Sequence, residues 1–118
     1  MKRLRILIVD DETTVLNVTS RLLQREGHET TTAIDAEWGL ALSHASRFDA
    51  ILMDVGLPGM SGLQALKQFA SSSKAAIFLM TGLGDAKLAQ QALTQGAKAL
   101  LPKPLDFNNL KGLLSVLP

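Results

Sequence analysis

The sequence predicts an α/β fold in which a doubly wound, five-stranded parallel sheet is covered by five helices. Short apolar segments recur along the chain, and helical patterns fill the stretches between them. Parallel strands need a crossover connection, which is usually a helix, so this alternation favours a parallel sheet. The length of 118 residues suits one domain with a core of its own.

Four of the expected strands are continuous apolar runs, which are typical of strands buried on both faces. The remaining one contains three successive threonines and is expected to lie at an edge of the sheet. The expected strands cover residues 4–9, 28–33, 50–53, 76–80 and 99–101.

The stretches between the strands have the apolar spacing of amphipathic helices and residues suited to helix ends. Asp35, Asp85 and Asp106 precede three of these stretches and are expected to cap their N-termini. Gly27 and Gly96 are expected to end two of them. The apolar positions that share a helix face are Val15, Val18 and Leu22; Leu63, Leu66 and Ala70; Leu88, Ala92 and Leu93; and Leu110, Leu113, Leu114 and Leu117.

Composition and charge argue against several classes of protein. Hydrophobic residues make up 47% and charged residues 19%, which is an ordinary globular balance. The chain has no cysteine, which removes thiolate chemistry and fits a reducing cytoplasm. A formal net charge of +1 argues against nucleic-acid binding by this segment. The apolar run at 4–9 is too short for a membrane span or signal peptide, so we expect a cytoplasmic protein.

Polar side chains stand at the ends of four expected strands. Singly, each has an ordinary role as a helix cap, a turn former, a strand residue or a solvated lysine. In an open parallel sheet, however, the ligand site lies at the carboxyl ends of the strands, near the point where strand order reverses. We therefore expect these side chains to converge. They are Asp10, Asp11 and Glu12 after the first strand, Asp54 after the third, Thr81 after the fourth and Lys103 after the fifth.

The charges of this group predict a metal ion. Asp10, Asp11 and Asp54 carry three negative charges and Lys103 returns one, which leaves a net charge of minus two. Crowded carboxylates raise each other's pKa or bind a cation, and oxygen ligands without cysteine or histidine favour Mg²⁺ over zinc. One carboxylate can then attack phosphorus to give an aspartyl phosphate, with Thr81 and Lys103 as partners of the phosphoryl oxygens.

Along its whole length the sequence resembles the receiver domain of bacterial two-component response regulators, which has a flavodoxin-like, CheY-like fold. The matching segments are 6–12, 54–62, Thr81-Gly82, and Gly96-Ala97 leading to Lys103-Pro104. Asp10, Asp54, Thr81 and Lys103 follow one another at separations of 44, 27 and 22 residues. On this resemblance, residues 1–118 are expected to form a single receiver domain.

The resemblance implies that Asp54 is the phosphoacceptor, charged from a phosphohistidine of a sensor histidine kinase or a phosphotransfer protein. It implies that Asp11 is a direct magnesium ligand and that Asp10 acts through bound water. Gly56 is expected to offer its backbone carbonyl to the metal.

The resemblance also assigns roles at the ends of the fourth and fifth strands. Lys103 is expected to bind the phosphoryl group, with a cis bond to Pro104, and Thr81 to be the switch hydroxyl. Leu100 departs from the family pattern, because an aromatic residue is usual there. We therefore expect the Thr81–Asp85 loop to carry the conformational change.

The partner surface is expected on the fourth helix, fifth strand and fifth helix, with Lys87, Lys98 and Lys111. The partner there is either an output domain or a separate target protein. The domain is expected to be a signalling switch that catalyses only its own phosphorylation and dephosphorylation. Two alternatives stay open, namely a degenerate receiver that binds partners without phosphorylation and a phosphatase with an aspartyl-phosphate intermediate.

Overall fold

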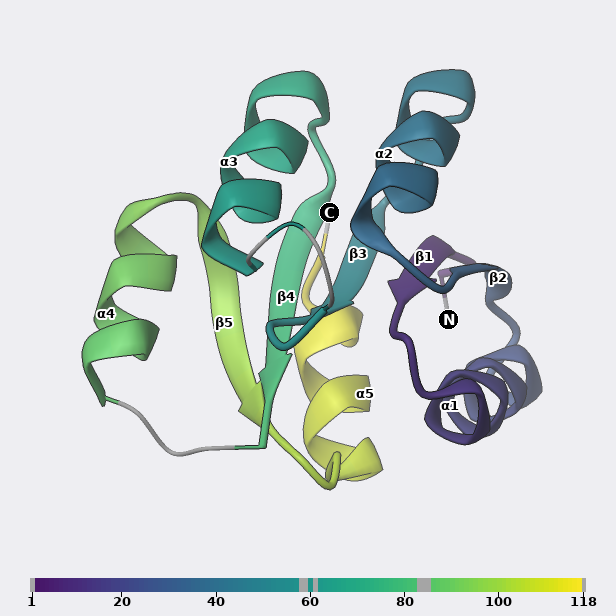
Figure 1. Cartoon of the computed structure of the whole chain (residues 1–118). Coiled ribbons are helices and arrows are strands. Elements are labelled where there is room, and N and C mark those ends of the chain that lie inside the picture. The colour runs from purple at the N-terminus through teal and green to yellow at the C-terminus, as the bar shows by residue number, and fades with distance from the viewer. Residues whose placement is uncertain (1, 58–59, 61, 83–85, 118) are drawn as a thin grey trace.

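The structure is a computed structural model that describes residues 2–57, 60, 62–82 and 86–117. Within those residues it has the predicted alternation of five strands and five helices (Figure 1). The elements are β1 (Arg5–Val9), α1 (Thr13–Arg25), β2 (Glu29–Ala33), α2 (Ala36–Ala45), β3 (Ala50–Asp54), α3 (Gly62–Ser72), β4 (Ala76–Thr81), α4 (Ala86–Thr94), β5 (Ala97–Pro102) and α5 (Phe107–Ser115).

The sheet is parallel throughout, and its strands follow the order β2-β1-β3-β4-β5. The chain steps outward from β1 to β2 and then returns to place β3 on the other side of β1. Strand order therefore reverses between β1 and β3, where an open α/β sheet binds its ligands. The threonine-rich strand β2 lies at an edge, as predicted.

Two helical layers cover the sheet: α1 and α5 lie on one face, and α2, α3 and α4 lie on the other (Figure 1). The strands supply both cores by alternation. In β1, Ile6 and Ile8 belong to the core beneath α1 and α5. Leu7 and Val9 belong to the core beneath α2, α3 and α4. All four side chains are at most 1% exposed, which explains why the strand reads as one unbroken apolar run.

The buried face of α1 differs from the predicted one. The buried residues are Leu16, Thr19 and Leu23, whereas Val18, which was predicted to share the apolar face, is 52% exposed. The two faces are related by a rotation of one residue. The predicted face contains Leu22 besides its two valines, so apolar area alone does not separate the two faces. The fit of Leu16 and Leu23 to the core over the sheet decides which face is buried.

The predicted faces of α3 and α4 are also only partly correct. In α3, Leu66 is buried as predicted, but Phe69 replaces the exposed Ala70 as the other large contribution. In α4, Ala92 is buried as predicted, whereas Leu93 is 53% exposed. A large aromatic side chain gains more from burial than a methyl group, which explains the choice in α3.

The predicted helix ends are confirmed wherever the structure describes them. Asp35 accepts a hydrogen bond from Trp38 N at 2.7 Å, and Asp106 accepts bonds from the first-turn amides of α5. Gly27 and Gly96 have φ angles of 92° and 114°, in the left-handed region that ends helices. Asp85 lies outside the described residues. In the part of the chain that is described, no helix is both long and apolar enough to span a membrane.

Candidate functional site

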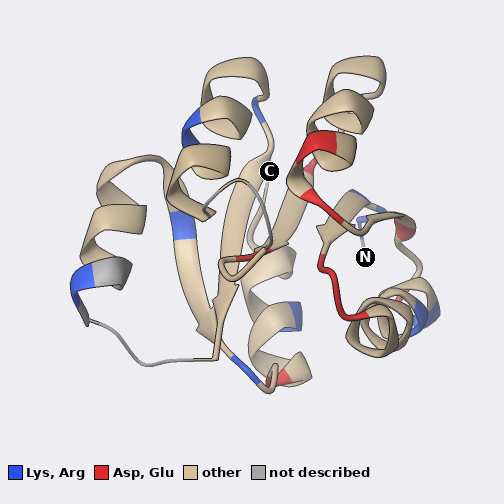
Figure 2. Cartoon of the chain, in the orientation of Figure 1, with Lys and Arg blue, Asp and Glu red and all other residues tan. Residues whose placement is uncertain are grey.

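Asp10 and Asp54 stand at the point where strand order reverses. Asp10 follows β1 and is fully buried, and Asp54 ends β3 and is 7% exposed. The sheet fixes both backbones, since Asp10 N donates to Ala33 O at 3.0 Å and Val55 N donates to Met80 O at 2.9 Å. Two nearly buried carboxylates therefore sit at neighbouring strand ends. In Figure 2 the ribbon has the colour of acidic residues just after β1 and at the end of β3.

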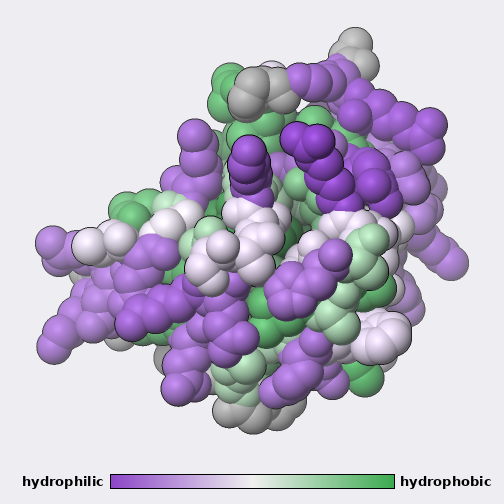
Figure 3. Space-filling view, turned by 90° about the horizontal axis from the view of Figure 1, so that it is seen from above, coloured by the Kyte–Doolittle hydropathy of each residue, from purple (hydrophilic) through white to green (hydrophobic). Residues whose placement is uncertain are grey.

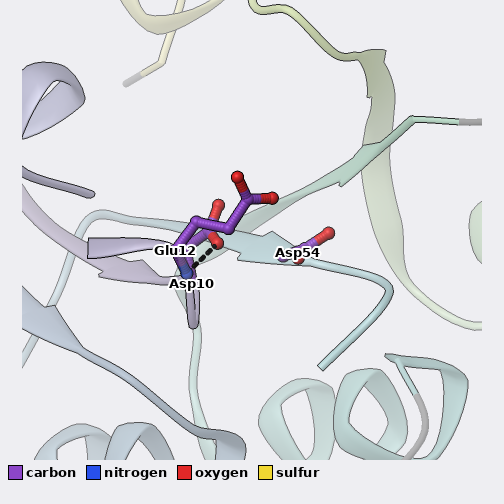
Figure 4. A group of neighbouring side chains, drawn as sticks. All are labelled: Asp10, Glu12 and Asp54. Atoms are coloured by element: carbon purple, nitrogen blue, oxygen red, sulfur yellow. Dashed lines mark hydrogen bonds between the residues drawn. The ribbon is translucent and has the colours of Figure 1, made fainter. Parts of the chain in front are cut away.

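Glu12, rather than Asp11, completes the acidic group. Ligand atoms of Asp10, Glu12 and Asp54 all lie within 4.8 Å of one another (Figure 4). Glu12 N donates to Asp10 Oδ1 at 2.9 Å, which turns the chain so that both carboxylates lie near Asp54. Asp11 is exposed and is not part of this group.

The sequence allowed these acids to cap the N-terminus of α1, but the side chain of Glu12 does not do so. Glu12 occupies the N-cap position of α1 but makes no side-chain capping hydrogen bond. The carboxylate of Asp10 is bonded to the Glu12 amide and to Lys103, outside the helix. The side chains of Asp10 and Glu12 therefore belong to the strand-end cluster and do not cap α1.

Lys103 is the cation at the centre of this cluster. Its Nζ lies 2.8 Å from Asp10 Oδ2, 3.4 Å from Asp54 Oδ2 and 3.7 Å from Glu12 Oε1. The three carboxylates and the ammonium together carry a net charge of minus two. Burial lowers the pKa of Lys103, but the hydrogen bond to Asp10 and the carboxylates of Asp54 and Glu12 outweigh it, so the pKa is raised above its ordinary value.

The backbone joins Lys103 to Thr81. Lys103 N donates to Thr81 O at 2.7 Å, just after β4 and β5 end side by side. Thr81 is the last residue of β4 and is 8% exposed. The peptide bond between Lys103 and Pro104 is cis, as the resemblance implied. The structure thus brings four of the predicted strand-end positions, at Asp10, Asp54, Thr81 and Lys103, to one edge of the sheet.

Two glycines shape the turn after β3. A Cβ atom on Gly56 would lie 3.9 and 4.0 Å from the two carboxylate oxygens of Asp54, so glycine leaves that carboxylate open to approach. Gly56 N donates to Asp54 Oδ1 at 3.2 Å. A Cβ atom on Gly62 would come within 2.8 Å of the Val55 backbone, so only glycine lets α3 begin against this turn.

Leu100, at the position where the family usually has an aromatic residue, is half-buried in β5. Its register partner on β4 is Leu79, and it packs against the core beneath α2, α3 and α4. The side chain therefore belongs to the packing of the sheet.

The donor set fits a hard divalent cation. It consists of carboxylate oxygens alone, carries excess negative charge and includes no histidine or cysteine, and such sites favour Mg²⁺ or Ca²⁺ over zinc. A buried carboxylate held beside an ammonium group also has the partners that phosphoryl transfer requires. Fold and site together are those of a small α/β domain of the CheY-like type.

The chain belongs to the response regulator receiver domain family, whose model matches residues 6–115. Protein PilH of Pseudomonas aeruginosa is 33% identical over 109 residues, which are 90% of either chain. Regulatory protein AtoC of Escherichia coli is 36% identical over 107 residues, which are 90% of this chain and 23% of AtoC. The chain thus spans nearly all of one curated relative and about a quarter of another.

Solved structures show the same fold. A CheY-like receiver domain protein from Methanospirillum hungatei superposes with a TM-score of 0.89 at 31% identity, over 97% of this chain and 92% of the other. A response regulator from Burkholderia pseudomallei, solved with a phosphorylated aspartic acid, a calcium ion and citrate, superposes with a TM-score of 0.86 at 27% identity. That match covers 99% of this chain and 67% of the other.

Proposed function

We propose that this receiver domain is a magnesium-dependent switch that carries its phosphoryl group on Asp54. The observation that carries the proposal is the nearly buried carboxylate of Asp54, with Lys103 Nζ at 3.4 Å and two more carboxylates beside it. The phosphorylated aspartic acid in the Burkholderia pseudomallei relative supports the same chemistry. We assign residues 1–118 to this one domain.

The phosphoryl donor is a phosphohistidine on a sensor histidine kinase or a phosphotransfer protein. An oxygen of Asp54 forms a bond to phosphorus as the nitrogen–phosphorus bond breaks, and the electron pair of that bond stays with the imidazole nitrogen. The open side of Gly56 leaves room for in-line approach to the Asp54 carboxylate. Lys103 offers its ammonium to one phosphoryl oxygen and Thr81 its hydroxyl to another.

Mg²⁺ would be held by Asp10, Asp11, Asp54 and the carbonyl of Gly56, and the proximity of Glu12 makes that carboxylate a further participant. When bound, the ion supplies positive charge that offsets the excess negative charge of the carboxylates and the phosphoryl group. Lys103 meanwhile keeps its charge, because its pKa is raised by its acidic neighbours.

The output surface is formed by α4, β5 and α5, where an output domain or a separate target protein binds. Lys87 and Lys98 are exposed there. Lys111 pairs with Glu26 of α1 at 3.2 Å, which ties α5 to α1 and leaves this lysine less available to a partner. The domain acts in the cytoplasm, without direct contact to nucleic acid or membrane, and performs no turnover beyond its own phosphorylation and dephosphorylation.

Mass spectrometry after incubation with acetyl phosphate tests this function. The wild-type chain should gain one phosphoryl group in the presence of Mg²⁺ and none with a chelator, and Asp54→Asn should gain none. Asp35→Asn is the matched control, because it neutralises an acid at the same edge and asparagine still caps α2. If Asp54→Asn gains as much phosphate as wild type, Asp54 is not the phosphoacceptor and another residue is. If neither gains phosphate, the domain is a degenerate receiver.

A further inference from the structure

A cavity lies at the opposite edge of the sheet from Asp54, beside the amino ends of β3 and β4. It is an open hollow of about 820 Å³, bordered by the α2–β3 connection, the α3–β4 connection and the start of β5. β3 begins beside this cavity at Ala50 and ends at Asp54. Four steps of about 3.3 Å along the strand separate its two ends by roughly 13 Å. The cavity is therefore independent of the cluster around Lys103.

The rim of this amino-edge cavity is basic. Arg47, Lys74 and Lys98 line it from three separate segments, and all three are exposed. Asp49 is the one acid among the described lining residues, and its Oδ2 already accepts a hydrogen bond from Arg5 N at 2.8 Å. Exposed lysines and arginines are ordinary on any surface. Here, however, three basic side chains surround one hollow, and the nearby carboxylate of Asp49 is already hydrogen-bonded. The hollow therefore has an excess of positive charge.

Strand β5 departs from regular pairing at this rim. Ile77 pairs with Ala97, and the next residue of β4, Phe78, pairs with Ala99, so Lys98 is an extra residue between the two pairs. An extra residue of this kind bends a strand and re-aims a side chain, and such irregularities are common beside binding sites. The irregularity thus lies at Lys98, the third basic residue that lines the cavity.

The lining combines polar and apolar surface in similar amounts. Phe48 and Ile77 lie at the base of the cavity but are 6% and 2% exposed, and Arg5 covers the Phe48 ring at 5.6 Å from its centre. The apolar surface within reach of a ligand comes from the half-buried Ala75, Ala76 and Leu117. Figure 3 looks onto this edge of the molecule and shows hydrophilic side chains around it with hydrophobic residues between them. Ser73 adds a donor, because its Oγ accepts from Ala75 N at 3.1 Å and its hydroxyl hydrogen remains to donate.

We propose that the amino-edge cavity binds a small organic anion with a flat apolar body, about the size of a mononucleotide. Pockets for such ligands measure roughly 300–1,000 Å³ and combine apolar walls with a few polar groups. A compact ligand can meet cations on three surrounding segments, with its apolar part against Ala75, Ala76 and Leu117. Guanidinium and ammonium groups favour phosphate or carboxylate. The inference does not depend on phosphorylation of Asp54.

Amide NMR titration of the whole chain with AMP, in the presence of a chelator, tests the proposal. We expect shifts confined to 43–49, 72–77 and 96–98, with a dissociation constant in the range of about 0.1–1 mM. Adenosine, which lacks the charge, and inorganic phosphate, which lacks the flat body, should each bind at least about tenfold more weakly.

Paired variants localise the binding. Arg47→Gln with Lys98→Gln should weaken AMP binding about tenfold or more. Arg21→Gln with Lys67→Gln removes the same charge from exposed positions on α1 and α3 and should leave binding unchanged. The proposal is overturned if AMP causes no shift at about 10 mM, if the shifts map to Asp10, Asp54 and Lys103, if adenosine or phosphate binds as well as AMP, or if both paired variants bind alike.

Discussion

Lys103 Nζ lies 2.8 Å from Oδ2 of Asp10, a residue 93 positions earlier in the chain. Asp10 is fully buried, and the ammonium group of Lys103 is its charged partner. The same ammonium faces Asp54 at 3.4 Å. Lys103 thus neutralises part of the charge of the buried Asp10. It also lies close enough to Asp54 to contact a group bound there.

Lys103→Met should destabilise the metal-free protein at pH 7.5 by about 2–4 kcal/mol, because Asp10 would keep a buried charge without its cation. Urea unfolding in the presence of a chelator measures the effect. The pKa of Lys103 is raised, so the stability that its charge contributes is full below its unfolded value of 10.5 and is lost only as the pH rises through the higher folded value.

Lys67→Met is the control for that experiment, since Lys67 is exposed on α3 and its loss should cost within about 0.5 kcal/mol. Millimolar Mg²⁺ should restore part of the stability of Lys103→Met, because it offsets the same excess negative charge. If Lys103→Met is as stable as Lys67→Met, the ammonium is not the counter-ion of the buried acid.

Mg²⁺ binding should separate the roles of Asp11 and Glu12. Asp11→Ala should weaken binding by more than about a hundredfold if Asp11 is a direct ligand, whereas Glu12→Gln, an outer carboxylate, should weaken it by at most about tenfold. Titration followed by amide shifts near Asp54 gives both constants. The reverse order would make Glu12 the direct ligand, in keeping with its place in the acidic group.

His28 should make stability depend on pH. Its Nδ1 accepts a hydrogen bond from Leu4 N at 3.1 Å, which requires the neutral imidazole. Burial lowers the pKa of His28, and Glu26 only partly opposes this. The stability that neutral His28 contributes is therefore full above the unfolded value of 6.5 and is lost as the pH falls through the lower folded value.

The variant His28→Asn tests whether titration of His28 lowers the stability as the pH falls. An asparagine oxygen can accept from Leu4 N without titrating, so the variant should lose less stability than wild type as the pH falls below 6.5. His28→Ala should cost about 1–3 kcal/mol at pH 7.5, because the Leu4 amide loses its partner. Unfolding curves from pH 5 to 8 decide the matter, and parallel curves for wild type and His28→Asn would exclude His28 as the titrating group.

Gly56→Asn should shorten the lifetime of phosphorylated Asp54 by about tenfold, which corresponds to about 1.4 kcal/mol of activation free energy. A side chain at this position begins 3.9–4.0 Å from both carboxylate oxygens, where its amide can orient an attacking water molecule. Decay of the phosphorylated mass after donor removal gives the rate. Gly56→Ala is the control for bulk alone, and equal lifetimes for both variants would show that the polar group has no effect.

The strand-end positions could be predicted because each polar residue follows an apolar run directly. Asp54 and Thr81 proved to be the last residues of their strands, and Asp10 follows its strand at once. Glu12 was expected at this edge but was left out of the predicted metal ligands. Its amide donates to Asp10 Oδ1 at 2.9 Å in the turn after β1, and its carboxylate lies in the acidic group. The available signal was an acid two residues after Asp10 in a turn that an aspartate side chain can stabilise.

Other features depend on tertiary contacts that sequence spacing does not contain. The partner of His28 is the amide of Leu4, 24 residues away, and it exists only because β1 and β2 pair. The face that α1 buries was decided by its fit to the sheet, since Val18 and Leu16 both belong to plausible apolar stripes. The extra residue at Lys98 likewise appears only in the pairing of β4 with β5.

The last prediction concerns how phosphorylation changes the output surface. An allosteric switch needs an element with two arrangements whose balance the phosphoryl group shifts. Leu100 is a poor candidate, because it packs into the core and pairs with Leu79. We expect the Thr81–Asp85 loop, of which 83–85 lie outside the described residues, to carry the change as the Thr81 hydroxyl closes on the phosphoryl group.

Beryllofluoride, which mimics the phosphoryl group on an aspartate, should therefore shift amides 82–90 strongly while the methyl signals of Leu100 stay nearly still. Leu100→Val, a smaller aliphatic residue, should keep the same pattern because no swinging ring is involved. Asp54→Asn with beryllofluoride is the control and should show neither change. A large movement of the Leu100 methyls together with silent amides at 82–90 would place the switch in β5 instead, since the core would then have to repack around that strand.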